Sequence, residues 1–99
     1  MRIFFTPEAE EEAEYCDTWW RENRPATANL FASELAEAKA LMLSVPDVGS
    51  VYATIDGQPV LRVLMKKTGH HLYYAVEPSL DRITVYSVWG ARKAHGPRL

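Results

Sequence analysis

Three runs of sequence decide the fold of this chain: Val60-Leu61-Arg62-Val63-Leu64-Met65, His71-Leu72-Tyr73-Tyr74-Ala75-Val76 and Arg82-Ile83-Thr84-Val85-Tyr86-Ser87-Val88-Trp89-Gly90. Each run is rich in β-branched and aromatic residues, which suit a pleated, half-buried surface. Thr68-Gly69 separates the first two runs and Pro78-Ser79-Leu80-Asp81 the last two, and both segments are typical of turns. The runs therefore predict three successive antiparallel strands.

Side chains along these predicted strands alternate between the two faces of the sheet, because a strand points successive side chains to opposite sides. One face is apolar and requires a core: Leu61, Val63, Met65, Leu72, Tyr74, Val76, Ile83 and Val85. The second face is mixed: Arg62, His71, Tyr73, Glu77, Thr84 and Tyr86. This alternation predicts an antiparallel sheet with one covered and one partly wet face, on which Arg62 could pair with Glu77.

The residues before the sheet predict an N-terminal strand and a first helix. Arg2-Ile3-Phe4-Phe5 is too short for a helix and suits an extra strand. Thr6-Pro7 can cap and begin a helix that continues to about Glu22. Its inner stripe would be Ala9, Ala13, Cys16 and Trp20. Because adjacent tryptophans point in different directions, we expect one of Trp19 and Trp20 in the core and the other at the rim.

A second helix follows a short connection. Asn23-Arg24-Pro25 interrupts the helical pattern, since a residue before proline avoids helical angles, and Pro25 can begin the next helix. That helix ends near Ser44, and its apolar side carries Ala28, Phe31, Leu35, Ala38 and Met42. The two helices form a predicted hairpin. The sequence leaves Val51-Tyr52-Ala53-Thr54-Ile55 open as either an edge strand or an irregular loop.

Length and composition indicate a single globular domain over residues 1–99. The chain has 99 residues, of which 47% are hydrophobic, enough for one modest core. It predicts an α+β fold, in which an N-terminal strand and a helical hairpin pack on one face of a mainly antiparallel sheet of three to four strands. No leader pattern opens the sequence and no apolar run reaches the ~20 residues of a membrane span, so we expect a cytoplasmic protein without membrane contact.

Charge is divided unevenly along the chain. Residues 1–49 carry four basic and ten acidic side chains, a balance of −6, and residues 50–99 carry seven basic and three acidic ones, a balance of +4. The division predicts an acidic helical layer on a sheet with a basic rim, which could meet a polyanion or an acidic peptide. The total of −2 argues against a general nucleic-acid binder.

Familiar catalytic and metal-binding motifs are absent from the sequence. Cys16 is the only cysteine, which excludes an intramolecular disulfide, and its place in the helical stripe predicts a packed, inert thiol. His70 and His71 are neighbours, so on a strand they would point to opposite faces and chelate a metal poorly. With no Gly-rich phosphate loop, zinc-ligand spacing or nucleophile elbow, the sequence predicts no metal and no cofactor.

The order of several short segments resembles the RelE/ParE superfamily of bacterial toxins. These segments are SVPDVGS (44–50), VLRVLM (60–65), HHLYYAVE (70–77) and the closing ITVYSVWGARKAHGP (83–97). In that family a strand-borne arginine precedes a tyrosine-rich strand, and the final strand ends in a Gly/Ala-Arg-Arg/Lys segment. The resemblance runs from about Phe5 to Pro97, which is nearly the whole chain.

The resemblance implies both a fold and a function. The implied fold is two helices on one face of a mainly antiparallel sheet. The implied function is the toxin of a type II toxin–antitoxin module of the plasmid-stabilisation type. Such a toxin inhibits growth and is neutralised by a cognate antitoxin protein, which wraps an extended and helical segment over it. Its cellular target would be DNA gyrase or mRNA on the ribosome.

The resemblance also implies catalytic residues for the case of a metal-independent ribonuclease. Arg62 matches the strand arginine of the family, Arg92 the arginine after the last strand, and His95 the tail position where ribonuclease members often place His or Tyr. Such groups would serve an attack of a 2′-hydroxyl on the adjacent phosphate. The sequence departs from the pattern, because residues 51–59 contain no lysine and the tail contains no tyrosine. These departures favour the ParE branch, with a gyrase-directed or unassigned mechanism.

Candidate partner-binding residues are aromatic or basic side chains expected near the rim: Trp19, Tyr52, Tyr73, Tyr86, Arg92 and Lys93. Tyr73 and Tyr86 could also stack on bases, but packing within the sheet is the better single explanation for both. The sequence therefore leaves three interpretations open: a gyrase-directed or unassigned toxin, a ribonuclease, and a non-toxic protein-interaction module.

Overall fold

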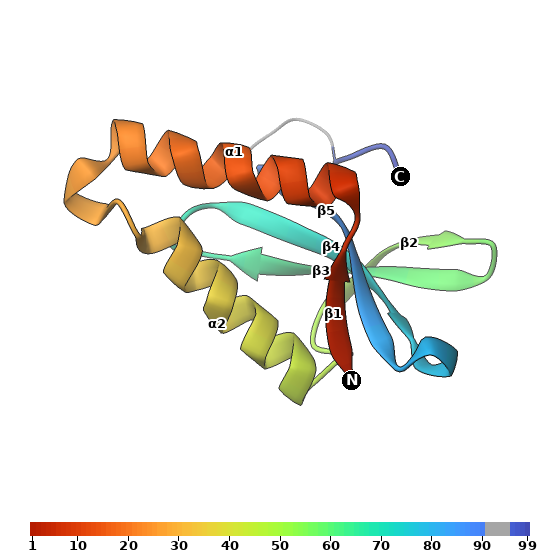
Figure 1. Cartoon of the computed structure of the whole chain (residues 1–99). Helices are drawn as coiled ribbons and strands as arrows, with labels where there is room; N and C mark the ends of the chain where they lie inside the picture. Colours follow the sequence, from red (N-terminus) through yellow and green to blue (C-terminus); the bar gives the residue numbers. More distant parts are fainter. Residues whose placement is uncertain (91–95) are drawn as a thin grey trace.

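The computed structural model of this chain describes residues 1–90 and 96–99 as a sheet packed against two α-helices (Figure 1). The elements follow in the order β1 (Arg2–Phe5), α1 (Pro7–Asn23), η1 (Pro25–Thr27), α2 (Leu30–Ser44), β2 (Ser50–Ile55), β3 (Gln58–Met65), β4 (His70–Glu77), η2 (Pro78–Leu80) and β5 (Arg82–Gly90). The elements η1 and η2 are short 3-10 turns. This arrangement confirms the predicted α+β class.

The sheet formed by the described residues has five strands in the order β1-β5-β4-β3-β2. β1 pairs with β5 in parallel, and every other neighbouring pair is antiparallel, so the sheet is mainly antiparallel as predicted. The segment that the sequence left open, 51–55, lies in the edge strand β2. The register of β2 on β3 shifts between Val51 and Ala53, which leaves Tyr52 as an extra residue in the strand. Such a bulge re-aims the side chain that it carries.

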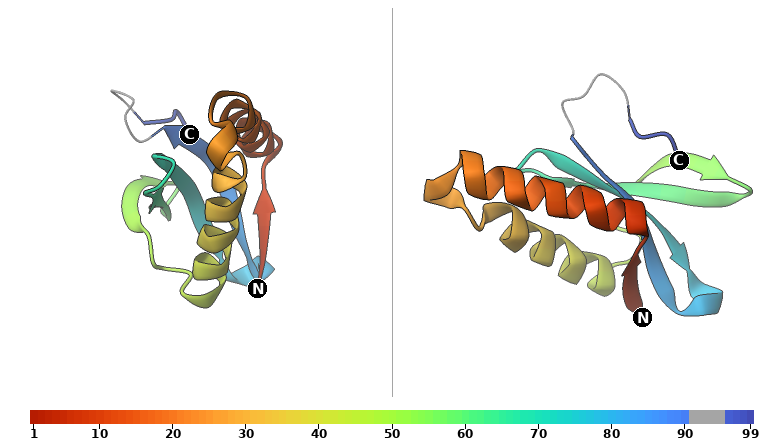
Figure 2. Two further views of the ribbon diagram at one scale, coloured as in Figure 1. Left: turned by 90° about the vertical axis from the view of Figure 1, so that its left-hand side faces the viewer. Right: turned by 45° about the horizontal axis from the view of Figure 1, so that its top comes forward.

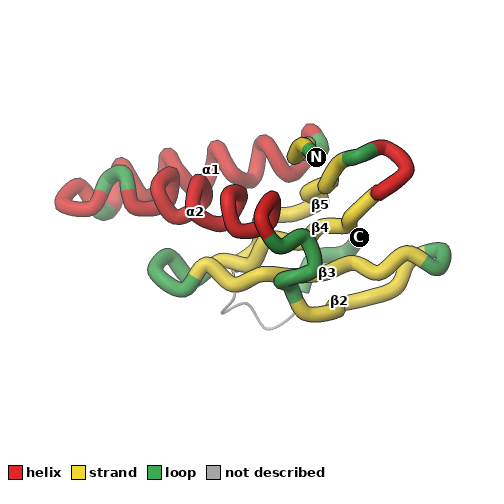
Figure 3. Tube along the Cα trace, turned by 90° about the horizontal axis from the view of Figure 1, so that it is seen from below, coloured by secondary structure: helices red, strands yellow, loops and turns green. Residues whose placement is uncertain are grey.

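Both helices cover the same face of the sheet (Figure 3). Their inner side chains form one core with β3, β4 and β5, which includes the buried Ala9, Phe31, Met42, Leu72 and Val85. Each large apolar side chain buried there contributes roughly 1.5–3 kcal/mol, so covering this face provides the main stabilisation. Trp20 packs on the core while Trp19 is 38% exposed, which confirms that the tryptophan pair divides between core and rim.

Local signals set the ends of the helices. The Thr6 hydroxyl accepts a hydrogen bond from the Ala9 amide at 3.2 Å, and a proline occupies the first turn of α1. The second helix begins later than the sequence predicted, at Leu30, because Pro25–Thr27 forms the 3-10 turn η1. The chain reverses direction here, and a 3-10 turn is a tight way to do so. Neither α-helix in the described part of the chain is long and apolar enough to cross a membrane.

Helix α1 is fastened to the part of the β5 edge that β1 does not cover. β1 pairs only with Arg82 to Val85, so the following β5 residues lack a strand partner on that side among the described elements. Glu12 of α1 fills part of this gap, because its carboxylate accepts hydrogen bonds from the Val88 amide at 2.9 Å and the Ser87 hydroxyl at 3.1 Å. The Glu12 carboxylate thus accepts the hydrogen bond that a neighbouring strand would otherwise accept, and it holds α1 along β5.

Helix α2 is tied to the turn between β3 and β4 by the buried Glu34. Its carboxylate accepts hydrogen bonds from the Lys67 amide at 2.6 Å, the Thr68 amide at 2.9 Å and the Thr68 hydroxyl at 2.7 Å. Burial by itself raises the pKa of Glu34, but the hydrogen bonds from Thr68 and Lys67 outweigh it, so the pKa lies below its ordinary value. Glu34 is therefore ionised near neutral pH and holds the turn against the helix.

The loop between α2 and β2 is held by the hydroxyl of the core residue Tyr74. This hydroxyl donates to the Pro46 carbonyl at 2.9 Å and accepts from the Gly49 amide at 2.9 Å. Burial raises the pKa of Tyr74, so the hydroxyl stays protonated and able to donate. A Cβ on Gly49 would lie 2.7 Å from the Arg62 carbonyl oxygen, which requires glycine at this close approach. The core thereby sets where β2 begins.

We expect Glu34→Gln to destabilise the protein at pH 7 by about 1–3 kcal/mol, because its amide nitrogen would face hydrogen-bond donors. Because the folded-state pKa of Glu34 is lowered, its contribution is present above the unfolded-state pKa and is lost as pH falls through the folded-state value. Urea unfolding of both chains between pH 7 and pH 3 should therefore show their difference shrinking in acid. Glu37→Gln, which changes only an exposed pair with Lys67, is the control. A difference that is constant with pH would contradict this assignment.

Candidate functional site

The sheet face opposite the helices, here called the open face, carries an aromatic cluster around Arg62. The Arg62 guanidinium lies 5.6 Å from the centre of the Tyr52 ring, and Tyr52 meets the Tyr73 ring edge-on at 4.6 Å. Arg62 and Tyr73 are direct partners in the β3–β4 register. The structure therefore brings three of the predicted site residues together. Tyr73 is only 2% exposed, so it supports Tyr52 and Arg62 from below and offers no surface to a partner.

Arg62 does not pair with Glu77, which corrects the pairing considered from the sequence. Glu77 lies opposite Arg82 in the β4–β5 register and forms an ion pair with it at 3.2 Å. The Thr84 hydroxyl also donates to Glu77. The Thr84 hydrogen bond first, and then Arg82, lower the pKa of Glu77 against the effect of burial. Among the described residues, the Arg62 guanidinium therefore contacts the Tyr52 ring instead of the Glu77 carboxylate.

His71 shares the open face with this cluster. Its ring meets Tyr73 edge-on at 5.8 Å. Burial, and then the positive charge of Arg62, lower the pKa of His71 below its ordinary value. The imidazole is therefore neutral near neutral pH, and Arg62 is the cation of the cluster.

Residues 96–99, here called the C-terminal segment, lie beside the β2–β3 hairpin (Figure 2) and pack against Tyr52. The Tyr52 hydroxyl donates to the Pro97 carbonyl at 3.2 Å, and Pro97 is buried. A Cβ added to Gly96 would collide with the Tyr52 ring and hydroxyl, so this approach requires glycine. The predicted residues Arg92, Lys93 and His95 lie outside the described residues.

A groove of about 830 Å³ on the open face runs between the C-terminal segment and the start of α1. Its charged lining, among the described residues, consists of four acidic side chains and one basic one: Glu8, Glu12, Asp56, Glu77 and Arg98. Its apolar lining includes Ile55, Val60, Ala75, Trp89 and Pro97. The predicted partner residue Tyr86 also lines the groove, and burial followed by the nearby Glu77 raises its pKa. Such a surface repels phosphate groups and suits a segment with basic and apolar side chains.

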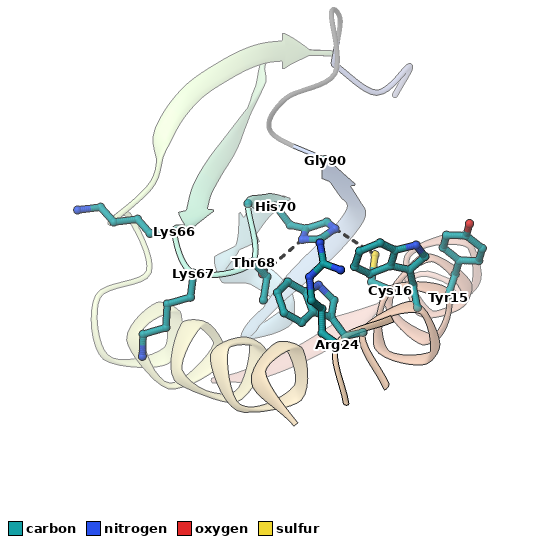
Figure 4. Close-up of a pocket in the computed structure, with 11 residues that line it drawn as sticks. Tyr15, Cys16, Arg24, Lys66, Lys67, Thr68, His70 and Gly90 are labelled. Atoms are coloured by element: carbon teal, nitrogen blue, oxygen red, sulfur yellow. Dashed lines mark hydrogen bonds between the residues drawn. The ribbon is translucent and has the colours of Figure 1, made fainter. Parts of the chain in front are cut away.

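A second cavity, of about 590 Å³, lies between the C-terminal half of α1 and the β3–β4 turn (Figure 4). Cys16 lines it with its sulfur 3.4 Å from Nε2 of His70, and Nδ1 of His70 lies 3.3 Å from the Thr68 hydroxyl. Trp19 lines the same cavity, with the Arg24 guanidinium 5.2 Å from the centre of its ring. No group of three or more His, Cys, Asp or Glu in the described part of the chain could hold a metal ion.

The sequence correctly placed Cys16 against the core but gave no sign of its partner. His70 is 54 residues away along the chain, and only the docking of α1 on the sheet brings the two together. The acidic groove was also missed, because its carboxylates come from α1, the β2–β3 turn and β4. The sequence feature most closely related to this groove was the cluster of glutamates in the first turns of α1. Acidic residues at that end of a helix are already accounted for by the helix dipole, so the cluster did not indicate a groove.

The contact between Tyr52 and Gly96 predicts a strong coupling between these two positions. We expect Gly96→Ala to lower the free energy of unfolding by about 1–3 kcal/mol, because the added methyl group overfills the contact. In a Tyr52→Ala background the ring is gone, and the same change should cost almost nothing. Urea unfolding of the four chains measures this coupling. An equal cost of Gly96→Ala in both backgrounds would show that the C-terminal segment does not pack on Tyr52.

Comparison with known proteins supports the fold. A chain of the solved structure described as "Chromosomal ParDE TA system from P. aeruginosa" superposes with a TM-score of 0.69 at 14% sequence identity. The superposition covers 93% of this chain and 97% of that chain. No family model matches the sequence, and no curated protein does. At this identity the likeness concerns the fold, and it confirms the α+β architecture that the sequence resemblance implied.

Proposed function

We propose that this chain is the toxin of a type II toxin–antitoxin pair and that a cognate antitoxin protein keeps it inactive. The observation that carries the proposal is the fold match to a chain of a ParDE TA system over nearly the full length of both chains. The order of sequence segments that resembles the RelE/ParE superfamily supports the same function. Fold and motif order are separate observations, since the structural match holds at only 14% identity.

The charge of the open face supports a toxin that acts by protein contact, directed at gyrase or at an unassigned target. A ribonuclease has to stabilise the negative charge that develops on a phosphate. Here Arg62 already lies over the Tyr52 ring, and the adjoining groove contains four carboxylates and one described cation. Those carboxylates would raise the cost of bringing an RNA backbone to this face.

Arg62 also supports the second candidate, a ribosome-dependent ribonuclease. It lies on the open face beside aromatic rings on which bases could stack. In that case Arg62, Arg92 and His95 would be the catalytic residues. Because the lowered pKa of His71 keeps its imidazole neutral near neutral pH, His71 does not supply a second positive charge beside Arg62.

The antitoxin would use the exposed aromatic and apolar side chains together with the acidic groove. Trp19 is 38% exposed on α1, and Tyr52 and Tyr86 are partly exposed on the open face. Together with Arg92 and Lys93, which follow β5 in the sequence, these residues are the proposed partner contacts. A segment that orders on binding can cover such a wide and shallow surface.

Induced expression in a bacterium, with DNA and protein synthesis followed separately, tests this proposal. We expect growth to stop, DNA synthesis to fail before protein synthesis, and an Arg62→Ala chain that folds normally to inhibit growth equally well. Co-expression of a protein from a short adjacent reading frame should restore growth. An early loss of protein synthesis with cut transcripts, abolished by Arg62→Ala, would instead establish the ribonuclease. Unchanged growth would leave a protein-interaction module.

A further inference from the structure

One side of α1 carries two surfaces of different chemistry. The side chains on it follow at steps of three and four residues: Glu8, Glu12, Tyr15 and Trp19. This side faces the end of β5, because Glu12 accepts a hydrogen bond from the Val88 amide. Glu8 and Glu12 line the acidic groove at one end of it. Tyr15 and Trp19 line the cavity of about 590 Å³ at the other end.

Two exposed aromatic rings form the apolar wall of this cavity. Tyr15 is 71% exposed and Trp19 is 38% exposed. The Trp19 ring meets the Trp20 ring edge-on at 5.9 Å, and Trp20 packs on the core. Trp19 is therefore held from behind while part of its surface faces solvent. A large aromatic side chain that is already held in place loses little conformational freedom on binding, which suits it to anchor a partner.

The charged lining of the cavity is basic. No acidic side chain lines it among the described residues, whereas three basic ones do: Arg24, Lys66 and Lys67. The Arg24 guanidinium lies 5.2 Å from the centre of the Trp19 ring and donates to the carbonyl of the preceding residue at 3.1 Å. Within the described part of the chain, Arg24 and Lys66 form no ion pair, and Lys67 has an exposed pair with Glu37 at 3.8 Å. A guanidinium has several donors, so Arg24 can bind a carboxylate while it covers the ring.

We propose that this cavity is a docking site for an acidic segment of a partner protein. In the bound state an apolar side chain of the segment packs on Trp19, and a neighbouring carboxylate pairs with the Arg24 guanidinium. Opposite charges across an interface speed the encounter and select the partner, and the aromatic anchor supplies contact area. This docking site differs from the acidic groove in its charge, and its chemistry holds whether or not the partner is an antitoxin.

The arrangement of charges favours a protein segment over a nucleic acid. Lys66 and Lys67 extend away from Arg24 in Figure 4, so the three cations do not converge on one phosphate group. A nucleic acid carries a charge at every phosphate, and a strand that continued along this side of α1 would next meet Glu12 and Glu8. A polypeptide can place its carboxylates at the cavity alone and continue with uncharged or basic residues. The cavity thus suits acidic residues that are confined to a short stretch.

Titration with short synthetic peptides tests the proposal. The probe is the capped peptide Glu-Glu-Leu-Glu-Phe-Glu-Glu, and the matched control peptide has glutamine in place of every glutamate. NMR follows the indole N–H of Trp19, assigned with a Trp19→Phe chain. We expect the acidic peptide to bind at Trp19 at least about fivefold more tightly than the control at low salt, and added salt to reduce the difference. No shift at Trp19 with millimolar acidic peptide, or equal binding of the two peptides, would overturn the proposal.

A short oligothymidylate, titrated in the same way, distinguishes a protein partner from a nucleic acid. We expect it to bind at Trp19 more weakly than the acidic peptide at equal salt, because its remaining phosphates meet the acidic half of α1. Tighter binding of the oligothymidylate at Trp19 would show a nucleic-acid site and contradict the assignment of a protein segment.

Substitution of Arg24 tests the contact assigned to it. Arg24→Gln should weaken binding of the acidic peptide at least about threefold and leave the control peptide unaffected, because it removes the charge and keeps an N–H donor. Arg21→Gln removes a cation that is paired with Asp17 outside the cavity, so it is the matched control for net charge. Arg24 is exposed and outside the core, and circular dichroism checks that both variants fold. Equal affinity of Arg24→Gln and wild type would refute the pairing.

Fluorescence quenching measures the sign of the charge around Trp19 without any peptide. The emission of Trp19 is the difference between the wild type and the Trp19→Phe chain. Its quenching by iodide and by caesium is divided by that of free N-acetyltryptophanamide in the same buffer. We expect iodide to quench Trp19 more efficiently than caesium, and Arg24→Gln to reduce this difference more than Arg21→Gln does. More efficient quenching by caesium would show that the cavity does not attract anions and would overturn the proposal.

Discussion

The docking of α1 on the exposed edge of β5 is the constraint on which the rest of this structure depends. β1 is four residues long and covers only the first part of β5, so the Val88 amide needs another acceptor. Glu12 provides it, together with a bond to Ser87, and thereby sets both the position and the rotation of α1. The inner stripe of the helix then faces the core, and α2 follows on the same face of the sheet.

Both candidate sites are consequences of where α1 lies. Its first turns contribute Glu8 and Glu12 to the acidic groove, and its second half contributes Cys16 and Trp19 to the cavity with His70. The acidic N-terminal half of the chain thus reaches the open face, where the sequence alone suggested a basic rim. A surface with this mixture of charges is less favourable for a nucleic-acid backbone than a uniformly basic surface would be.

Much of the fold could be predicted from the sequence, because it depends on local patterns. Alternating side chains in 60–65, 71–76 and 82–90 were enough for three strands, and capping with helical spacing was enough for α1. The β2 strand was undecided because its bulge at Tyr52 breaks the alternation. Contacts between distant segments had no local signal. The partner of Glu77 depended on strand register, and the Cys16–His70 contact depended on how a helix packs on a sheet.

Native-state hydrogen exchange at the Val88 amide tests the docking of α1 on β5 most directly. If Glu12 is the acceptor of this amide, Val88 should be protected like its neighbours within β5. Glu12→Ala should then make it exchange at least about tenfold faster, while Glu11→Ala, at an exposed neighbouring position, should not. An unprotected Val88 amide in the wild type, or protection that survives Glu12→Ala, would contradict this account of how helix and sheet are joined.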